Sequence, residues 1–265
     1  MRGLCTTLCD DYADGAAVMI KSFLDNNTWY TDDILIICWG TLSAEQKLRI
    51  GSLSKKIIFH EIDERAYSKA EVDGRRQWNY VPATRFAMFK LLGYDRLVYL
   101  DADVVVVGDV RELFDTSASF GACRLKPGMG FELRNQGGFD AGVFTVGSEF
   151  ISRYVHDALV HIAMGDQWSG NQIVLNLYFA DSVEYLSPIF NVTTSQLTNE
   201  TLDTARILHF AGAEKPWHLT ARISERRIAN MGLPLASRAL DVWDYWAAKA
   251  RSANSSEAAS ALCSQ

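Results

Sequence analysis

Short apolar runs alternate with amphipathic segments through the first hundred residues. Four of these runs are rich in β-branched and aromatic residues and too short for helices, so they predict buried strands. They lie at residues 3–9, 33–40, 55–62 and 96–103. The segments between them show helical spacing or helix-end signals, such as Ser43 with Gln46 three residues later. These predicted helices lie at residues 14–27, 41–53 and 82–93.

Strands separated by connections long enough for crossovers indicate an α/β domain with a mostly parallel sheet. Beyond residue 103 the pattern becomes mixed. There the sequence predicts strands at 120–124, 139–146, 183–187 and 206–210, and helices at 149–164, 171–180 and 238–250. Because neither an internal repeat nor a low-complexity linker interrupts this pattern, a second independent domain is not expected.

The composition is that of a globular chain with a large core. Of its 265 residues, 48% are hydrophobic, which is enough to bury the interior of one large domain. Charged residues make up 22% of the chain and the net charge is -6, which argues against an extended nucleic-acid-binding surface. We therefore expect no nucleic-acid partner.

The five cysteines are scattered and form no Cys-x-x-Cys pair, a pattern more typical of a reducing compartment than of a disulfide framework. No apolar run reaches the roughly 18 residues that a membrane-spanning helix needs. The sequence therefore predicts a soluble, cytoplasmic protein. The cysteines are Cys5, Cys9, Cys38, Cys123 and Cys263.

The stretch YLDADVVVVGDV, at residues 99–110, places two carboxylates at the end of a predicted strand. Acidic side chains are seldom fully buried unless they are paired or bind a metal. Residues two apart in an extended segment face the same side, so Asp101 and Asp103 are expected to point at one cation, with Ala102 facing away. Such oxygen ligands suit Mg²⁺ or Mn²⁺. A solvated strand end is the simpler alternative.

The same stretch, LVYLDADVV, also fits the strand-plus-Asp-x-Asp signature of the haloacid-dehalogenase-like phosphohydrolases. In that interpretation Asp101 is the nucleophile and Asp103 the acid or base. The signature usually opens its domain, whereas three predicted strands precede it here. A Mg²⁺-dependent phosphohydrolase is therefore kept as an alternative function.

A second polar cluster follows the predicted strand at 206–210, in the stretch ILHFAGAEKPWH. His209 offers an imidazole to the same cation, Gly212 lets the backbone approach an anion closely, and Lys215 is a point charge for a phosphate. Taken alone, His209 would more often be a structural histidine. Together with the Asp pair, these residues predict a site for a metal ion and a diphosphate.

With these motifs in place, the sequence resembles glycosyltransferase family 8, the glycogenin-like and galactosyltransferase-like retaining enzymes, over residues 3–218. YLDADVVVVGDVRELFD is similar to the family's metal motif, and HFAGAEKPW to its H-F-x-G-x-x-K-P-W motif. Between them, FDAGVFTVG resembles the F-N-x-G-V strand and NQIVLNLYF the D-Q-x-x-L-N segment. The resemblance implies a Rossmann-like nucleotide-diphospho-sugar transferase fold of the GT-A type, with a mixed, mostly parallel central sheet flanked by helices. It divides the chain into a catalytic domain at 1–218 and a C-terminal helical extension at 219–265.

The resemblance also implies an activity. Family members move a hexose-type sugar, with retention, from a nucleotide diphosphate sugar, usually a UDP-sugar, to a hydroxyl of a carbohydrate, glycolipid or protein acceptor. The expected cation is Mn²⁺ or Mg²⁺. Asp101, Asp103 and His209 match its ligands, and Gly212 and Lys215 match the groups that hold the diphosphate. The other candidates for donor binding are Thr6, Thr7, Tyr12, Arg85 and Ala102.

Two of these donor-binding candidates have a specific expected role. Tyr12 is able to stack on uracil. Arg85 matches a basic residue that contacts the donor, and the alternative is a solvent-facing charge on a helix.

Two positions depart from the family pattern. The family's usual Asn is Asp140 here, and its usual Asp is Asn171, beside a retained Gln172. These three residues are the catalytic candidates, because the matching positions face the sugar and the acceptor. The exchange affects the identity of the donor sugar more than the class of reaction. Either the swap keeps one carboxylate in the pocket, at Asp140, or Asp166 supplies a carboxylate as well. It also leaves a non-catalytic nucleotide-sugar-binding module as a third interpretation.

Two further segments carry open alternatives. Residues 124–138, RLKPGMGFELRNQGG, read either as a mobile lid or acceptor loop or as an ordinary long connection. In the C-terminal extension, six basic residues stand against three acidic ones over 221–251, and a helical stripe includes Trp243 and Trp246. This helix would either dock on an anionic membrane or, as we favour, pack its tryptophans on the core. A homodimer is also left open, and the last dozen residues are expected to fray.

Overall fold

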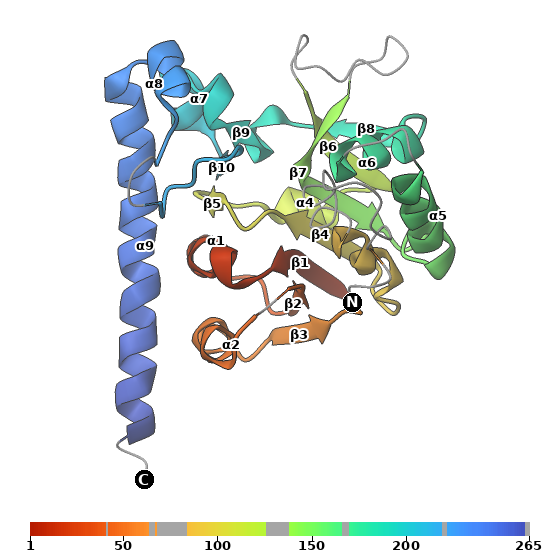
Figure 1. The fold of residues 1–265 in the computed structure, drawn as a ribbon, viewed down its shortest axis with the longest axis horizontal. Helices are drawn as coiled ribbons and strands as arrows, with labels where there is room; N and C mark the ends of the chain where they lie inside the picture. Colours follow the sequence, from red (N-terminus) through yellow and green to blue (C-terminus); the bar gives the residue numbers. More distant parts are fainter. Residues whose placement is uncertain are drawn as a thin grey trace, which may run out of the picture.

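The computed structural model describes residues 1–40, 42–63, 67, 84–125, 138–165, 170–218 and 222–262. Within these residues, seven strands form one sheet: β1 (Arg2–Leu8), β2 (Asp33–Cys38), β3 (Ile57–Glu61), β4 (Arg96–Leu100), β6 (Phe120–Arg124), β7 (Phe139–Gly147) and β8 (Val183–Leu186). Their order across the sheet is β3-β2-β1-β4-β7-β6-β8 (Figure 1). Of these described strands only β7 runs against its neighbours, and the other pairings are parallel. The predicted α/β fold with a mixed, mostly parallel sheet is confirmed.

The central strands are apolar on both faces because helices cover both sides of the sheet. Alternate side chains of β1 and β2 enter two different cores. Leu4 and Ile34 pack with α1 (Ala13–Asn26) and with α9 (Leu233–Leu262). Cys5 and Leu35 pack on the other face, towards η3 (Thr84–Lys90), α5 (Arg153–Met164) and α6 (Asn171–Phe179). The buried cysteines Cys5, Cys9, Cys38 and Cys123 are free thiols, and Cys263 lies outside the described residues.

The remaining described elements are short helices of three to eight residues. Ser43 caps α2 (Ala44–Gly51) by accepting a hydrogen bond from the Gln46 amide at 3.3 Å, as its sequence predicts. The others are η1 (Asp10–Tyr12), α4 (Arg111–Asp115), η4 (Pro188–Phe190), η5 (Thr194–Gln196), α7 (Asn199–Thr204) and α8 (Glu225–Met231). None of the helices in the described part of the chain is long and apolar enough to cross a bilayer.

The helix predicted at residues 82–93 is present, but it is a tighter helix than an α-helix and ends earlier than expected. The described part of this segment is the 3₁₀ helix η3, which ends at Lys90. It is wedged between the strands β1 and β2 and helix α5, and Phe86, Met88 and Phe89 are all fully buried. Packing on nearly every side sets the tighter turn, which apolar spacing alone cannot distinguish from an α-helix.

The C-terminal helix α9 runs along one side of the molecule past α1 (Figure 1). Trp243 and Trp246 are buried in the core beside α1, so the interpretation of core packing is confirmed and these two rings are not exposed to a membrane. The expectation that the last dozen residues fray is wrong as far as Leu262, because the helix continues to that residue. Ala, Glu and Leu are strong helix formers, and the stretch contains neither Gly nor Pro.

The chain changes sheets at the predicted metal motif. Strand β4 ends at Leu100, and β5 (Val104–Val106) belongs to a second, three-stranded sheet with β10 (Ile207–His209) and β9 (Val192–Thr193). Asp101 and Asp103 therefore lie in the turn between two strands, and the expected extended geometry is wrong. The valines of β5 pair antiparallel with β10, which places His209 opposite Val104. This pairing brings two segments a hundred residues apart into one site.

Candidate active site

A cavity of about 320 Å³ opens where the two sheets meet, at the carboxyl ends of β1 and β4. It lies at the edge where parallel α/β sheets bind ligands. Twelve of the thirteen residues predicted from the sequence line it: Thr7, Tyr12, Arg85, Asp101, Ala102, Asp103, Asp140, Asn171, Gln172, His209, Gly212 and Lys215. Thr6 does not line the cavity. Neighbouring residues of a strand point to opposite faces, so Thr7 faces the cavity and Thr6 is buried on the other side.

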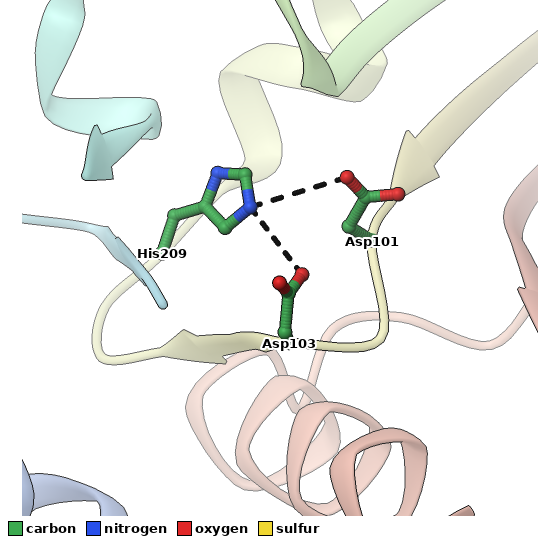
Figure 2. A group of neighbouring side chains, drawn as sticks. All are labelled: Asp101, Asp103 and His209. Atoms are coloured by element: carbon green, nitrogen blue, oxygen red, sulfur yellow. Dashed lines mark ion pairs between the residues drawn. The ribbon is translucent and has the colours of Figure 1, made fainter. Parts of the chain in front are cut away.

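Three side chains form a compact cluster of hard and imidazole ligands (Figure 2). His209 Nε2 lies 3.3 Å from Asp103 Oδ1 and 3.9 Å from Asp101 Oδ2. One ligand atom from each of the three residues lies within 4.8 Å of the other two. Asp103 and His209 are buried, and Asp101 is partly exposed to the cavity. The three atoms thus face a common point at the cavity wall.

The two carboxylates have different partners on opposite sides. Asp101 Oδ1 accepts hydrogen bonds from Arg85 at 3.0 Å and from the Tyr99 hydroxyl at 3.0 Å. Arg85 also donates to the carbonyl of Ala141 at 2.6 Å, so it is anchored inside the site and is not a solvent-facing charge. On the other side, Lys215 donates to Asp103 Oδ2. In each carboxylate, one oxygen therefore faces His209. The other oxygen is bonded to a cationic side chain, Arg85 for Asp101 and Lys215 for Asp103.

The charges around His209 act strongly on its protonation. Burial lowers the pKa of His209, but the neighbouring Asp103, Asp140 and Asp101 outweigh this effect and raise the pKa to about 9. Burial raises the pKa of Asp101, and Asp103 adds to that increase against the opposing effect of Arg85. For Asp103, burial is outweighed by His209 and Lys215, which hold its pKa below its ordinary value. The three carboxylates thus make this corner of the cavity attractive to positive charge.

These residues fit a divalent cation. Two carboxylates and one imidazole are a donor set that Mn²⁺ accepts, and Mg²⁺ is bound through similar carboxylate pairs with substrate phosphates completing the shell. Gly142 also keeps the space open, because a Cβ at this position would lie 2.2 Å from His209 Cε1 and 3.0 Å from Asp101 Oδ2. Asp101, Asp103 and His209 are the residues that would hold the ion.

The two residues predicted to hold the diphosphate, Gly212 and Lys215, line the same cavity as the candidate cation ligands. Gly212 has a positive φ of 111°, and a Cβ there would lie 2.5 Å from the Arg227 guanidinium, so glycine fits this position without strain. Lys215 is buried, with its ammonium 5.7 Å from the ring centroid of Tyr12. Trp217 packs edge-on against the same ring at 5.7 Å. The candidate cation site, the Lys215 ammonium and the Tyr12 ring therefore lie next to one another in the cavity.

The predicted catalytic residues line the same cavity, and Asp140 Oδ1 lies 3.8 Å from His209 Nδ1. Asp140 and Gln172 are held by backbone amides: Asp140 Oδ1 accepts from Gly142 at 2.8 Å, and Gln172 Oε1 accepts from Ala141 at 3.1 Å. Asn171 begins helix α6 and lines the same cavity. Asp166, the other candidate carboxylate, lies outside the described residues, as do residues 126–137 of the predicted lid or acceptor loop.

Several residues at the site were not predicted from the sequence. Trp39 and Ala211 line the cavity. Tyr99 joins Thr7 to Asp101, since its hydroxyl lies 2.8 Å from Thr7 Oγ1. Trp39 directly follows β2, so its place at the carboxyl end of a parallel strand was a usable signal. Asn191 bonds to two site residues at once, and no spacing or motif singled it out.

Comparison with known proteins identifies the family of this chain. Residues 4–221 match the family model described as Glycosyl transferase family 8, so the chain belongs to glycosyltransferase family 8. This match favours the glycosyltransferase interpretation over the phosphohydrolase.

The individual relatives share less than a third of their aligned residues with this chain. The chain is 24% identical to human glycogenin-1 over 227 residues, which cover 81% of this chain and 61% of that protein. It is 28% identical to glycogenin of Neurospora crassa over 220 residues, covering 79% of this chain and 30% of that protein. The chain thus spans less than two thirds of the length of these relatives. The galactosyltransferase LgtC, solved with donor and acceptor sugar analogs, superposes with a TM-score of 0.71 at 18% identity, covering 92% of this chain and 95% of LgtC, which supports the GT-A-type fold.

Proposed function

We propose that this chain transfers a hexose-type sugar, with retention, from a uridine diphosphate sugar to a hydroxyl acceptor, and that the reaction depends on Mn²⁺ or Mg²⁺. The observation that carries the proposal is the meeting of Asp101, Asp103 and His209 beside Lys215 in one cavity of a family 8 chain. The acceptor class is a carbohydrate, a glycolipid or a protein.

The donor's nucleoside and diphosphate would lie along the cavity from Tyr12 to Lys215. Tyr12 presents a ring for stacking on the base, and its place beside Trp217 limits its rotation. Lys215 is buried, so its charge is poorly screened by water and acts strongly on a nearby anion. Its present partner is Asp103 Oδ2, and a diphosphate oxygen offers the same kind of charged acceptor.

Departure of the nucleoside diphosphate is the step that this site is built to assist. A divalent cation held by Asp101, Asp103 and His209 would act as a Lewis acid on the diphosphate. Lys215 adds a second positive charge near the leaving group, and Arg85 holds Asp101 in place from the other side. Asp140 and Gln172, fixed by backbone amides, are the groups placed to stabilise positive charge on the sugar ring.

The proposal is tested by nucleotide binding and turnover together. At a UDP concentration of one hundred times the dissociation constant, binding stabilises the fold by about 2.7 kcal/mol. We expect UDP to raise the melting temperature more with Mn²⁺ than with EDTA, and UMP to raise it less than UDP. No shift with UDP and Mn²⁺ would contradict the proposal. UDP release from UDP-glucose or UDP-galactose then separates an enzyme from a binding module, which would bind UDP without turnover.

Replacing Lys215 by Met should weaken UDP binding. A hydrogen bond to a charged group contributes about 1.5–3 kcal/mol, which corresponds to roughly a 10- to 100-fold loss of affinity. Calorimetric titration of UDP in the presence of Mn²⁺ measures the effect. Lys56→Met, which removes an exposed lysine outside the cavity, is the matched control and should bind UDP like the unmodified protein. Equal affinities for all three proteins would remove Lys215 from the diphosphate site.

A further inference from the structure

Asn191 joins the candidate cation site to the neighbouring carboxylate of Asp140. It lies between η4 and β9, and its side chain is buried. Its Oδ1 lies 2.8 Å from His209 Nδ1, and its Nδ2 donates to Asp140 Oδ1 at 2.9 Å. One amide side chain thus bridges a cation ligand and a predicted catalytic carboxylate, although Asn191 is distant from both in sequence.

The direction of this hydrogen-bonded chain follows from the chemistry of its members. An ionised carboxylate only accepts hydrogen bonds, so the amide nitrogen of Asn191 must face Asp140. Its carbonyl oxygen then faces His209, and a carbonyl oxygen also only accepts. His209 must therefore carry a proton on Nδ1, which makes it the donor of that bond. The other ring nitrogen, Nε2, is the one that faces Asp101 and Asp103.

We propose that Asn191 is a positioning residue: it holds the His209 ring with its Nδ1 proton inward, so that Nε2 presents its lone pair to the divalent cation, while its amide group fixes Asp140. This inference rests on the proposed function, because it assumes that the cation binds at Asp101, Asp103 and His209. A second partner that holds the far nitrogen of a ligating histidine fixes the ring's tautomer and orientation, and its loss costs about 10- to 100-fold in metal affinity.

The exchange at position 140 gains a physical meaning from this chain of bonds. An Asn at this position could accept the same hydrogen bond through its oxygen, with less charge. Asp140 offers only acceptors, so the nitrogen of Asn191 must face it, and its negative charge strengthens that hydrogen bond. It also has its own anchor, since the Gly142 amide donates to the same oxygen, Oδ1, at 2.8 Å. Asp140 is thereby oriented from two sides.

The experiment separates the acceptor role of Asn191 from a purely structural one. Mn²⁺ binding is titrated by the electron paramagnetic resonance signal of the free ion, with and without UDP. Asn191→Ala removes the acceptor for His209 and should weaken Mn²⁺ binding about 10- to 100-fold. Asn191→Asp keeps an acceptor for His209 but sets a second carboxylate against Asp140, so it should bind Mn²⁺ less tightly than the unmodified protein and clearly more tightly than Asn191→Ala. Thr193→Val, on the same segment, removes a buried hydroxyl bonded only to Ser195 in the described contacts and is the matched control.

A spectroscopic measurement reads the histidine directly. In the Co²⁺-loaded protein, the Nδ1 proton of His209 should give a shifted proton resonance that exchanges slowly with water, because Asn191 and the protein interior protect it. Asn191→Ala should broaden or abolish this resonance, and Asn191→Asp should retain it. If Asn191→Ala does not fold, the similarly shaped, apolar Asn191→Leu takes its place in both measurements.

The outcomes distinguish this inference from the proposed function. If the unmodified protein binds neither Mn²⁺ nor UDP, the proposed function fails and the inference fails with it. If the unmodified protein binds both, but Asn191→Ala or Asn191→Leu binds Mn²⁺ equally well, only the inference is overturned. Equal weakening by Asn191→Asp and Asn191→Ala would overturn it too, because an acceptor at this position would then have no effect.

Discussion

Asp101→Asn is expected to abolish cation-dependent sugar transfer, with a loss of about 10³-fold in UDP release from a UDP-sugar. The substitution keeps the shape of the side chain but removes one of two carboxylates that face the shared point with His209. An amide oxygen carries far less charge than a carboxylate, and charge stabilisation at a leaving group is often the largest contribution to catalysis. The site would keep Asp103 and His209 but lose one of its charged ligands.

The stability of Asp101→Asn should move in a different direction from its activity. Asp101 and Asp103 repel each other in a partly buried site, and burial disfavours the charge of Asp101. The neutral variant relieves both effects, while its carbonyl oxygen still accepts from Arg85 and Tyr99. A melting temperature equal to or above that of the unmodified protein is therefore expected.

The measurement compares initial rates of UDP release at saturating Mn²⁺ with melting curves of the same preparations. Asp181→Asn removes an equal charge from an exposed position outside the cavity and should leave both quantities unchanged. An Asp101→Asn protein that releases UDP at the full rate would remove Asp101 from the cation site.

Gly142→Ala is expected to disrupt the cation site by filling space between two of its ligands. The added methyl carbon would lie 2.2 Å from His209 Cε1 and 3.0 Å from Asp101 Oδ2. Gly142 is buried in β7, where its carbonyl accepts from the Asp101 amide at 2.8 Å, so the backbone has little freedom to retreat. The His209 ring must move instead, which separates it from the carboxylates.

This clash has two measurable results. Overpacking of a buried site costs about 1–3 kcal/mol, so the free energy of unfolding should fall by that amount in urea titrations. Mn²⁺ affinity should fall at least about tenfold, because the donor atoms no longer face one point. Gly51→Ala is the matched control: its Cβ would lie 3.6 Å from Phe59, an ordinary contact at the end of a helix, and a small gain in stability is expected. Unchanged Mn²⁺ affinity in Gly142→Ala would show that the ligands are not held as the structure indicates.

Much of the fold could be predicted because its signals are local. Apolar strands, connections of crossover length and the Ser43 cap each depend on a few neighbouring residues, and the structure confirms them. The type of η3 could not be predicted, because its 3₁₀ geometry depends on elements that pack on it from several sides. The same holds for the extent of α9, whose first half is stabilised by burial against α1.

The candidate site shows the same division. Asp101, Asp103, His209 and Lys215 lie in recognisable motifs, so the residue types and their chemistry could be read in advance. Asn191 could not, because its importance depends on two hydrogen bonds to residues remote in sequence. Only the folded structure shows that its buried amide group lies between His209 and Asp140.

The sequence by itself therefore determined the fold class, the family resemblance and the set of candidate residues for a cation and a diphosphate. Only the tertiary structure decided how the carboxylates meet the histidine: the chain leaves the large sheet after Leu100, turns through Asp101 and Asp103, and joins a second sheet where β5 pairs with β10. The physical reason is that periodicity and composition report which face of an element is buried. They carry no information on which distant strand it pairs with, and that pairing builds the site.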